Sequence, residues 1–151
     1  MLAVMGFKDG NITRTESPKI LIVEDNSDDE VLLIRQLKKA KLHRHVRCAY
    51  NGKQALEYLK DSSDGLSTVF LDLKLPKLSG LEVLEAIRKD PRTFDLAVIV
   101  MTSSTSPEEL EECRRLGVVS FIQKPLTLTS FVKAFADTFH SRRCQATSEV
   151  C

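Results

Sequence analysis

Short apolar runs alternate along the chain with longer segments in which apolar residues recur at helical spacing. The runs rich in β-forming residues cover residues 19–24, 45–50, 67–72, 96–101 and 118–122. Each segment between two runs is long enough for a crossover helix, and another helical segment follows the last run. The pattern therefore predicts five consecutive βα units.

The predicted helices begin at residues that commonly cap helices. Ser27, Ser79 and Ser106 are each followed three residues later by glutamate, which is the pattern of a capping box. Asn51 begins a weaker version of the same signal, and Gly117 is placed to end the fourth helix. These signals give each predicted strand a helix partner.

Three phenylalanines recur at steps of four residues on the fifth predicted helix, at Phe131, Phe135 and Phe139. This spacing puts them on one face of the helix. They are interpreted as core or docking residues rather than as a ligand site.

Alternating βα units are typical of an α/β fold, in which helices cover both faces of a doubly wound parallel sheet. Ligands of such sheets bind beyond the carboxyl ends of the strands. Polar residues follow four of the five predicted strands, so we expect them to share one rim of the sheet. They are Glu24, Asp25, Asp72, Thr102 and Lys124.

Asp72 is the most informative of these residues, because it ends an apolar run over residues 69–71. A carboxylate at the edge of a buried strand loses hydration that a cation, hydrogen bonds or another charged partner must replace. With Glu24, Asp25 and Lys124, the rim carries three negative charges and one positive charge. A hard divalent cation would balance them, and oxygen donors without a nearby cysteine or histidine favour Mg²⁺ over zinc or copper.

Each rim residue has an ordinary explanation when it is taken alone. The acids at residues 24–25 and 28–29 would favour the dipole of the next helix, Thr102 suits a strand, and Lys124 is a typical surface charge. Their joint placement instead favours a phosphoryl-transfer site, where charge on the transferred oxygens must be neutralised. Asp72 would be the nucleophile of such a site.

The composition is that of one ordinary globular domain. The chain has 151 residues, of which 42% are hydrophobic and 28% charged, so disorder is not expected as its main state. The polar, aperiodic residues 1–18 and 141–151 are expected to form flexible tails around a domain over residues 19–140. A formal net charge of +1 gives no field that would attract DNA or an anionic membrane.

Other sequence signals narrow the class of protein. Four cysteines lack zinc-site spacing and are interpreted as reduced thiols. No run approaches the roughly 18 apolar residues of a membrane span, and the N-terminal stretch does not form a secretory signal, so the cytoplasm is the expected location. No glycine-rich phosphate loop occurs and the chain has only 6 glycines, which argues against a nucleotide-binding enzyme.

Four motifs together resemble a known family. ILIVEDN over residues 20–26, LDLKLPKLSG over 71–80, VIVMTSS over 98–104 and FIQKP over 121–125 are similar to the receiver domain of bacterial two-component response regulators. The resemblance covers about residues 19–140. It implies a flavodoxin-like (βα)5 fold with strand order 2-1-3-4-5 and a cis peptide before the proline of FIQKP.

The resemblance also implies roles for six residues. Asp72 matches the residue that accepts phosphoryl from a histidine kinase, and Glu24 and Asp25 match residues that hold Mg²⁺ beside it. Thr102 and Lys124 match residues that contact the phosphoryl group, and Phe121 matches a rotating aromatic switch. Glu24 stands where many members carry aspartate, and Phe121 lacks the hydroxyl of the tyrosine found in others.

The implied function is that of a stand-alone, chemotaxis-regulator-like receiver, which is not an enzyme beyond its own phosphoryl transfer and dephosphorylation. Too few residues follow Lys124 for a DNA-binding output domain. We therefore expect the signal to leave through the fourth helix, fifth strand and fifth helix, to another protein or a second copy. The single-domain layout and the DLKLPK stretch are similar to regulators paired with bacteriophytochrome kinases. Two alternatives are an unphosphorylated pseudo-receiver scaffold and an intermediate that passes phosphoryl to a histidine phosphotransfer protein.

Overall fold

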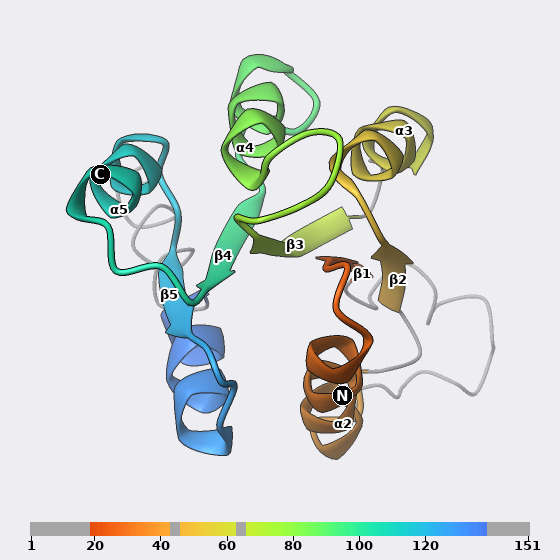
Figure 1. Ribbon diagram of the computed structural model, residues 1–151. Coiled ribbons are helices and arrows are strands. Elements are labelled where there is room, and N and C mark those ends of the chain that lie inside the picture. Colours follow the sequence, from red (N-terminus) through yellow and green to blue (C-terminus); the bar gives the residue numbers. More distant parts are fainter. Residues whose placement is uncertain (1–18, 43–45, 63–65, 139–151) are drawn as a thin grey trace, which may run out of the picture.

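One parallel sheet organises the part of the chain that the computed structural model describes, residues 19–42, 46–62 and 66–138 (Figure 1). Its five strands stand in the order β2-β1-β3-β4-β5. The prediction of a doubly wound α/β sheet with order 2-1-3-4-5 is confirmed. The strands are β1 (Lys19–Val23), β2 (Val46–Ala49), β3 (Leu66–Asp72), β4 (Ala97–Thr102) and β5 (Ser120–Gln123).

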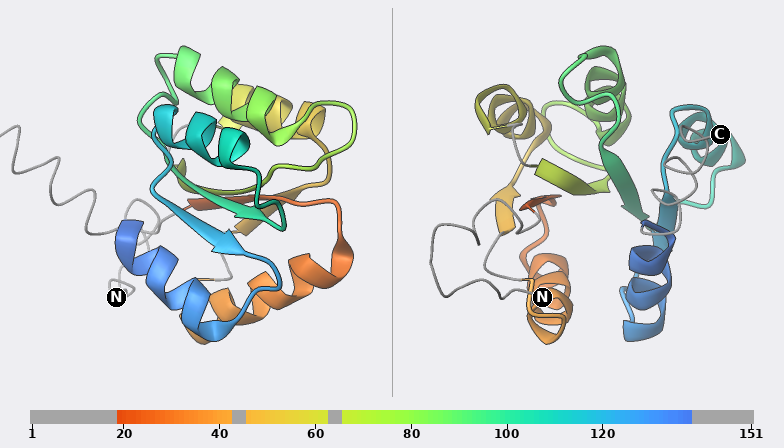
Figure 2. Two further views of the ribbon diagram at one scale, coloured as in Figure 1. Left: turned by 60° about the vertical axis from the view of Figure 1, so that its left-hand side comes forward. Right: turned by 180° about the vertical axis from the view of Figure 1, so that it is seen from behind.

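Helices cover both faces of this sheet (Figures 1 and 2). One face carries α3 (Gly52–Ser62), α4 (Gly80–Lys89) and α5 (Pro107–Arg115). The other carries α2 (Ser27–Lys39) and a helix over residues 128–138, which we call the C-terminal helix. No helix of the described residues is long and apolar enough to span a membrane.

The sheet separates two apolar cores. Alternate residues of each strand enter opposite cores, as Val69 and Leu71 do on one face and Phe70 on the other. Every residue of β4 is buried, as expected for a central strand covered on both faces.

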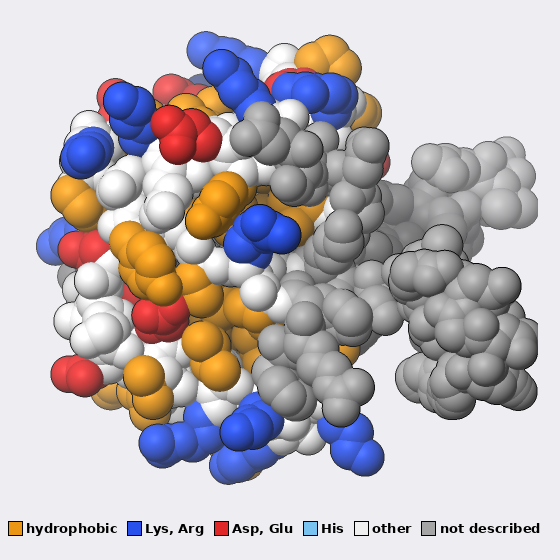
Figure 3. Space-filling model, turned by 90° about the vertical axis from the view of Figure 1, so that its right-hand side faces the viewer, with side chains coloured by type: hydrophobic (Ala, Val, Ile, Leu, Met, Phe, Trp, Pro, Cys, Tyr) orange, Lys and Arg blue, Asp and Glu red, His pale blue; other side chains and the backbone are white. Residues whose placement is uncertain are grey.

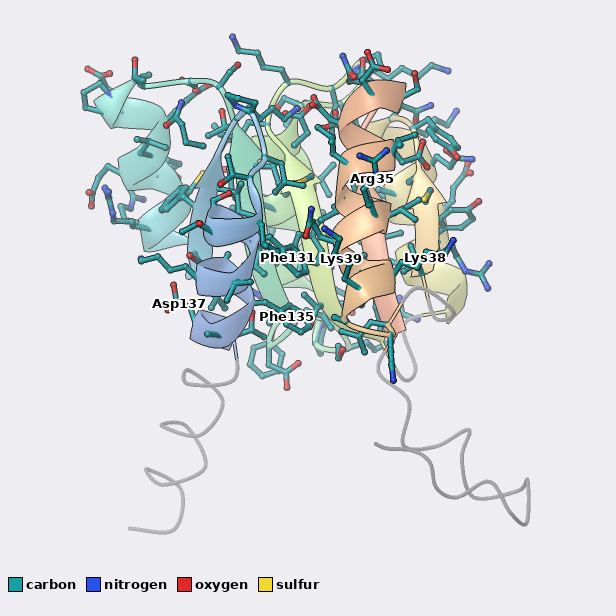
Figure 4. The ribbon with its side chains drawn as sticks, turned by 90° about the horizontal axis from the view of Figure 1, so that it is seen from below. Arg35, Lys38, Lys39, Phe131, Phe135 and Asp137 are labelled. Carbon is teal, nitrogen blue, oxygen red and sulfur yellow. The ribbon has the colours of Figure 1, made fainter. Side chains whose placement is uncertain are left out.

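The C-terminal helix closes the second core with aromatic rings. The Phe131 ring stacks on Phe70 with centroids 6.0 Å apart and on Phe135 with centroids 5.5 Å apart. Both labelled rings lie between the C-terminal helix and α2 (Figure 4). Their interpretation as core residues is confirmed, and Phe139 lies outside the described residues.

The edge strand β2 bounds one side of the molecule. Hydrophobic side chains gather near the middle of this side, with lysines and arginines above and below them (Figure 3). The Arg47 guanidinium lies 5.5 Å from the centroid of the Tyr58 ring and partly covers it. Arg47 is exposed, and a cation–π contact at an exposed site contributes about 0.5–1 kcal/mol.

The helix boundaries mostly follow the predicted signals. Ser79 forms both hydrogen bonds of a capping box with Glu82, and Ser106 caps α5 with proline at its first turn. Gly117 has a φ of 76° just beyond α5, which confirms its predicted place at the helix end. The peptide bond between Lys124 and Pro125 is cis.

The predicted cap of α2 is wrong by one residue. Asn26, not Ser27, caps this helix, because its Oδ1 accepts a hydrogen bond of 3.0 Å from the Asp29 backbone N–H. Asparagine caps helices as well as serine does, so the earlier residue starts the helix.

Gly80 fixes how α4 leaves the end of β3. Its N–H donates to the Leu73 carbonyl at 2.9 Å, and a Cβ added here would overlap the Asp72 carbonyl oxygen and the Leu73 Cα. These are backbone atoms, which cannot turn aside as a flexible side chain can. Only glycine lets the helix start lie directly against the end of β3.

Gly80→Ala should lower the free energy of unfolding by about 1–3 kcal/mol, because the added carbon forces α4 away from β3. Urea unfolding measures the change. Glu85→Ala, at an exposed position of the same helix, is the matched control and should change stability by less than about 0.5 kcal/mol. Equal stabilities of the Gly80→Ala protein and the parent would contradict the close approach.

Candidate functional site

The carboxyl ends of β1, β3 and β5 bring an ammonium and two carboxylates together. Asp72 is the last residue of β3, Glu24 follows β1, and Lys124 follows β5. The Lys124 Nζ donates to Glu24 Oε2 at 2.6 Å and to Asp72 Oδ2 at 3.1 Å. These contacts join residues far apart in the sequence, as the parallel sheet predicts.

Three carboxylates of the rim lie close enough to share a cation. Glu24, Asp25 and Asp72 each offer an oxygen within 4.8 Å of the others. Glu24 and Asp72 are 1% and 5% exposed, whereas Asp25 is exposed. The set therefore has a buried floor and one acid open to solvent.

Backbone N–H groups orient the two buried carboxylates. The Asn26 N–H donates to Glu24 Oε1 at 3.3 Å, and the Lys74 N–H donates to Asp72 Oδ1 at 3.1 Å. The second oxygen of each acid is the one that meets Lys124. In each carboxylate, one oxygen therefore accepts a backbone N–H and the other accepts from Lys124.

Asp29 is a fourth acid at this site, and the sequence reasoning assigned it only to the helix dipole. Its Oδ2 lies 2.9 Å from Lys124 Nζ, from the first turn of α2. The sequence places the acids of this turn near the rim, because the helix after β1 starts there. The spacing alone did not reveal which acid of that turn faces the lysine.

Burial and charge shift the pKa values of the central pair. Burial, reinforced by Asp72, raises the pKa of Glu24 from 4.5 to about 7, although Lys124 acts in the opposite direction. Burial would lower the pKa of Lys124, but hydrogen bonds to Glu24 and Asp29 and the charge of Asp72 hold it above its ordinary value. Lys124 is therefore a permanent cation, whereas Glu24 titrates near neutrality.

Thr102 ends β4 and is 2% exposed. Its Oγ1 accepts a hydrogen bond of 2.9 Å from the Ser104 N–H, and its carbonyl accepts one of 2.9 Å from the Lys124 N–H. The side chain therefore fixes the loop toward α5, while the backbone ties the end of β4 to Lys124.

Phe121 pairs with Val100 in the sheet and is half-buried. The Arg114 guanidinium of α5 lies 5.5 Å from its ring centroid. The Phe121 ring thus lies on the side of β5 that faces α5, where a change in its position would alter the contact between these elements.

The donor set fits Mg²⁺. All three acids offer oxygen, which this hard cation prefers, and the exposed Asp25 leaves a side open for retained waters. The Lys124 ammonium already contacts two of these acids, Glu24 and Asp72. An incoming ion would have to share or replace those contacts.

Comparison with known proteins identifies relatives. The sequence matches the family model of the response regulator receiver domain over residues 20–136. The probable methanogenesis regulatory protein FilR2 of Methanothrix harundinacea is 35% identical over 127 residues, which are 81% of this chain and 82% of that protein. The two-component response regulator ARR17 of Arabidopsis thaliana is 30% identical over 128 residues, 78% of this chain and 82% of ARR17.

Solved structures give the same picture. The bacteriophytochrome response regulators RtBRR and AtBRR are each 36% identical, with TM-scores of 0.71 and 0.68. Each alignment covers 81% of this chain, with 77% of RtBRR and 91% of AtBRR. The chemotaxis response regulator CheY4 of Vibrio cholerae, 22% identical with a TM-score of 0.71, supports the flavodoxin-like fold alone.

Relative to the parent, the Glu24→Gln protein should gain free energy of unfolding between pH 5 and pH 8. The pKa of Glu24 is raised from 4.5 to about 7 in the folded protein. The contribution of Glu24 to the free energy of unfolding is therefore fully present below pH 4.5 and is lost as the pH rises toward 7. Glutamine does not titrate, so the stability of the variant minus that of the parent should increase by about 1–3 kcal/mol from pH 5 to pH 8.

Urea unfolding in EDTA at several pH values measures this difference. The charged groups around Glu24, namely Asp25, Asp29, Asp72 and Lys124, are present in both proteins, so subtraction largely removes their own pH dependence. Glu85→Gln in α4 is the exposed control. A difference that stays constant with pH would contradict the raised pKa.

Proposed function

The chain belongs to the response regulator receiver domain family, and we propose that Asp72 is the residue on which it accepts phosphoryl from a sensor histidine kinase. Receiver domains act in two-component systems as signalling proteins rather than as classical enzymes, and they partner with histidine kinases. The observation that carries the proposal is the contact of the Lys124 ammonium with Asp72 and Glu24 beside the exposed Asp25.

The geometry of Asp72 suits a nucleophile. Its Oδ1 is held by the Lys74 N–H, so the carboxylate plane is fixed before a donor arrives. An Asp72 oxygen would attack the phosphorus of a phosphohistidine, the new O–P bond would form as the N–P bond breaks, and the imidazole would leave with the electron pair. Lys124 would stabilise negative charge on the transferred group.

Glu24, Asp25 and Asp72 would hold Mg²⁺ at this site. When bound, Mg²⁺ would neutralise charge on the phosphoryl oxygens. Glu24 stands where aspartate is common in the family, and its longer arm would let its carboxylate reach the ion through a water. The Lys74 N–H would orient Asp72. The exposed Asp25 would hold the ion on its solvent side.

Thr102 and Phe121 would carry the response away from Asp72. If the Thr102 hydroxyl turns toward the phosphoryl group, it gives up the Ser104 N–H and frees the loop before α5. Space near Thr102 would then become available to the Phe121 ring. A shift from mostly inactive to mostly active needs roughly 3–5 kcal/mol, which a few charge-assisted hydrogen bonds to Thr102 and Lys124 can supply.

The output surface would consist of α5, β5 and the C-terminal helix. The contact of Arg114 with Phe121 joins α5 to β5, and a 2.9 Å hydrogen bond from Ser120 to Asp137 joins β5 to the C-terminal helix. A change at β5 would therefore reach both helices. A second copy of the chain or another protein partner would bind this surface. In the alternative function, a histidine phosphotransfer protein would take the phosphoryl group from Asp72.

A bacteriophytochrome kinase is the kinase type that the comparisons favour, because RtBRR and AtBRR are bacteriophytochrome response regulators. The site would work in the cytoplasm, within one domain over residues 19–140, and the acyl phosphate would be lost by hydrolysis at the same site. A scaffold that is never phosphorylated is the rival function. The joint presence of Asp25, Asp72, Thr102 and Lys124 favours the phosphorylated receiver.

Acetyl phosphate with Mg²⁺ should add one phosphoryl group to the protein, and Asp72→Asn should abolish the addition. Asparagine lacks the nucleophilic carboxylate but keeps the size of the side chain. Intact-mass measurement detects the product, EDTA should prevent it, and Glu85→Gln should label as the parent does. Equal labelling of the Asp72→Asn protein and the parent would reject Asp72 as the acceptor, and labelling that survives EDTA would reject the metal role.

Lys124→Ala should leave Asp72 able to accept phosphoryl but weaken the conformational response, because it removes the ammonium that would sense the group. Amide exchange over residues 102–138, with and without beryllofluoride, should show smaller changes in the variant than in the parent. Lys133→Ala, exposed on the C-terminal helix, is the control. Identical changes in the Lys124→Ala protein and the parent would remove Lys124 from the switch.

The same parent experiment tests the output surface. Beryllofluoride should alter amide exchange in α5, β5 and the C-terminal helix, and unaltered exchange throughout them would refute this surface. Sedimentation of the same samples then identifies the partner class: a larger mass indicates a second copy, and a constant mass indicates a different protein.

A further inference from the structure

Among the residues that the structure describes, the Lys124 ammonium has three carboxylate partners, of which Asp29 is the one outside the proposed metal-binding set. The Asp29 Oδ2 lies 2.9 Å away, compared with 2.6 Å for Glu24 and 3.1 Å for Asp72. We propose, building on the phosphoacceptor site above, that Asp29 is a positioning residue. It keeps a charged partner for Lys124 when a divalent cation occupies Glu24 and Asp72, and so raises the affinity of the site for that cation.

The ammonium and a divalent cation need the same oxygens. The Oε1 of Glu24 and Oδ1 of Asp72 each accept a backbone N–H, whereas Oε2 and Oδ2 accept from Lys124. An ion that enters between the acids must therefore compete with Lys124 for the second oxygen of each. The cost of this exchange depends on what Lys124 can still contact afterwards.

Asp29 is placed to stay in contact with Lys124 when an ion binds the other acids. It is not one of the three acids whose oxygens lie within 4.8 Å of one another, so an ion centred on them leaves it free to hold the lysine. The Asp29 N–H is bound by the Asn26 cap at 3.0 Å, which fixes the first turn of α2 beside the rim. Its side chain is 24% exposed, so the ammonium would move toward solvent.

Lys124 needs such a partner because its side chain is only 16% exposed. A partly buried ammonium that loses two carboxylates and finds no replacement pays a large desolvation penalty. With Asp29 present, one charge-assisted hydrogen bond survives the exchange. Without it, Lys124 would hold Glu24 and Asp72 against the incoming ion.

The test is a double-mutant cycle on Mg²⁺ affinity, measured by calorimetry on the full chain. Asp29→Asn should weaken Mg²⁺ binding about three- to tenfold, the size of a partly exposed charge-assisted contact. Asp28→Asn removes the same charge from the same turn at an exposed position and should change affinity by less than about twofold. In a Lys124→Ala background, Asp29→Asn should also change affinity by less than about twofold, because the competing ammonium is gone.

A second readout separates positioning from general damage to the fold. The Mg²⁺ concentration for half-maximal phosphorylation by acetyl phosphate should rise in the Asp29→Asn protein by the same factor as the dissociation constant. The maximal rate at saturating Mg²⁺ should stay within about twofold of the parent. Asp29→Glu should recover part of the affinity, because it restores the charge.

The outcomes are distinct. Parental Mg²⁺ affinity in the Asp29→Asn protein would overturn the inference and leave the phosphoacceptor proposal intact. An equal loss in the Lys124→Ala background would overturn it too, because Asp29 would then act on the ion directly. Absence of Mg²⁺ binding by the parent would overturn both the metal site and this inference.

Discussion

The shared ammonium of Lys124 is the interaction on which the rim depends. Glu24 and Asp72 are buried acids within reach of each other, and two such charges need a compensating cation. Lys124 provides it through contacts of 2.6 and 3.1 Å. Because β5 must lie at its place in the sheet for this lysine to arrive, the electrostatics of the site and the strand order support each other. Burial, with the neighbouring Asp72, still raises the pKa of Glu24 to about 7, although Lys124 acts in the opposite direction.

The fold connects the charged rim to the neighbouring strand and helices. β3 and β4 are largely buried on both faces, so Asp72 stands at the end of a rigid strand, as the proposed acceptor would require. On one side of it, β5 pairs with β4 along the sheet. Two further contacts lie there: the Lys124 N–H donates to the Thr102 carbonyl, and the Arg114 guanidinium lies over the Phe121 ring. A buried strand end beside such side-chain contacts would suit a two-state switch, because binding at the rim could favour one of two arrangements of the Arg114 and Phe121 side chains.

The features that hydrophobic periodicity and turn residues determine were predictable from the sequence. Five βα units, the shared rim and the helix end at Gly117 all follow from residue patterns that act locally. The cap of α2 was misplaced because Asn26 and Ser27 are both good caps and only the backbone decides between them. The contact of Asp29 with Lys124 could not be predicted, since it depends on how α2 is rotated about its axis relative to a strand far away in the sequence. Contacts between side chains far apart in the sequence depend on how helices and strands pack, and this packing is not visible in the periodicity of the sequence.

A crystal structure with Mg²⁺ and beryllofluoride tests most directly whether the Lys124 ammonium exchanges its carboxylate partners when an ion and a phosphoryl mimic bind. We expect beryllofluoride on an Asp72 oxygen, Mg²⁺ held by the carboxylates of Glu24, Asp25 and Asp72, and Lys124 in contact with a fluoride and with Asp29 but no longer with Glu24. If Lys124 still bridges Glu24 and Asp72 while both ligands are bound, or if beryllofluoride binds elsewhere, the central claim is contradicted.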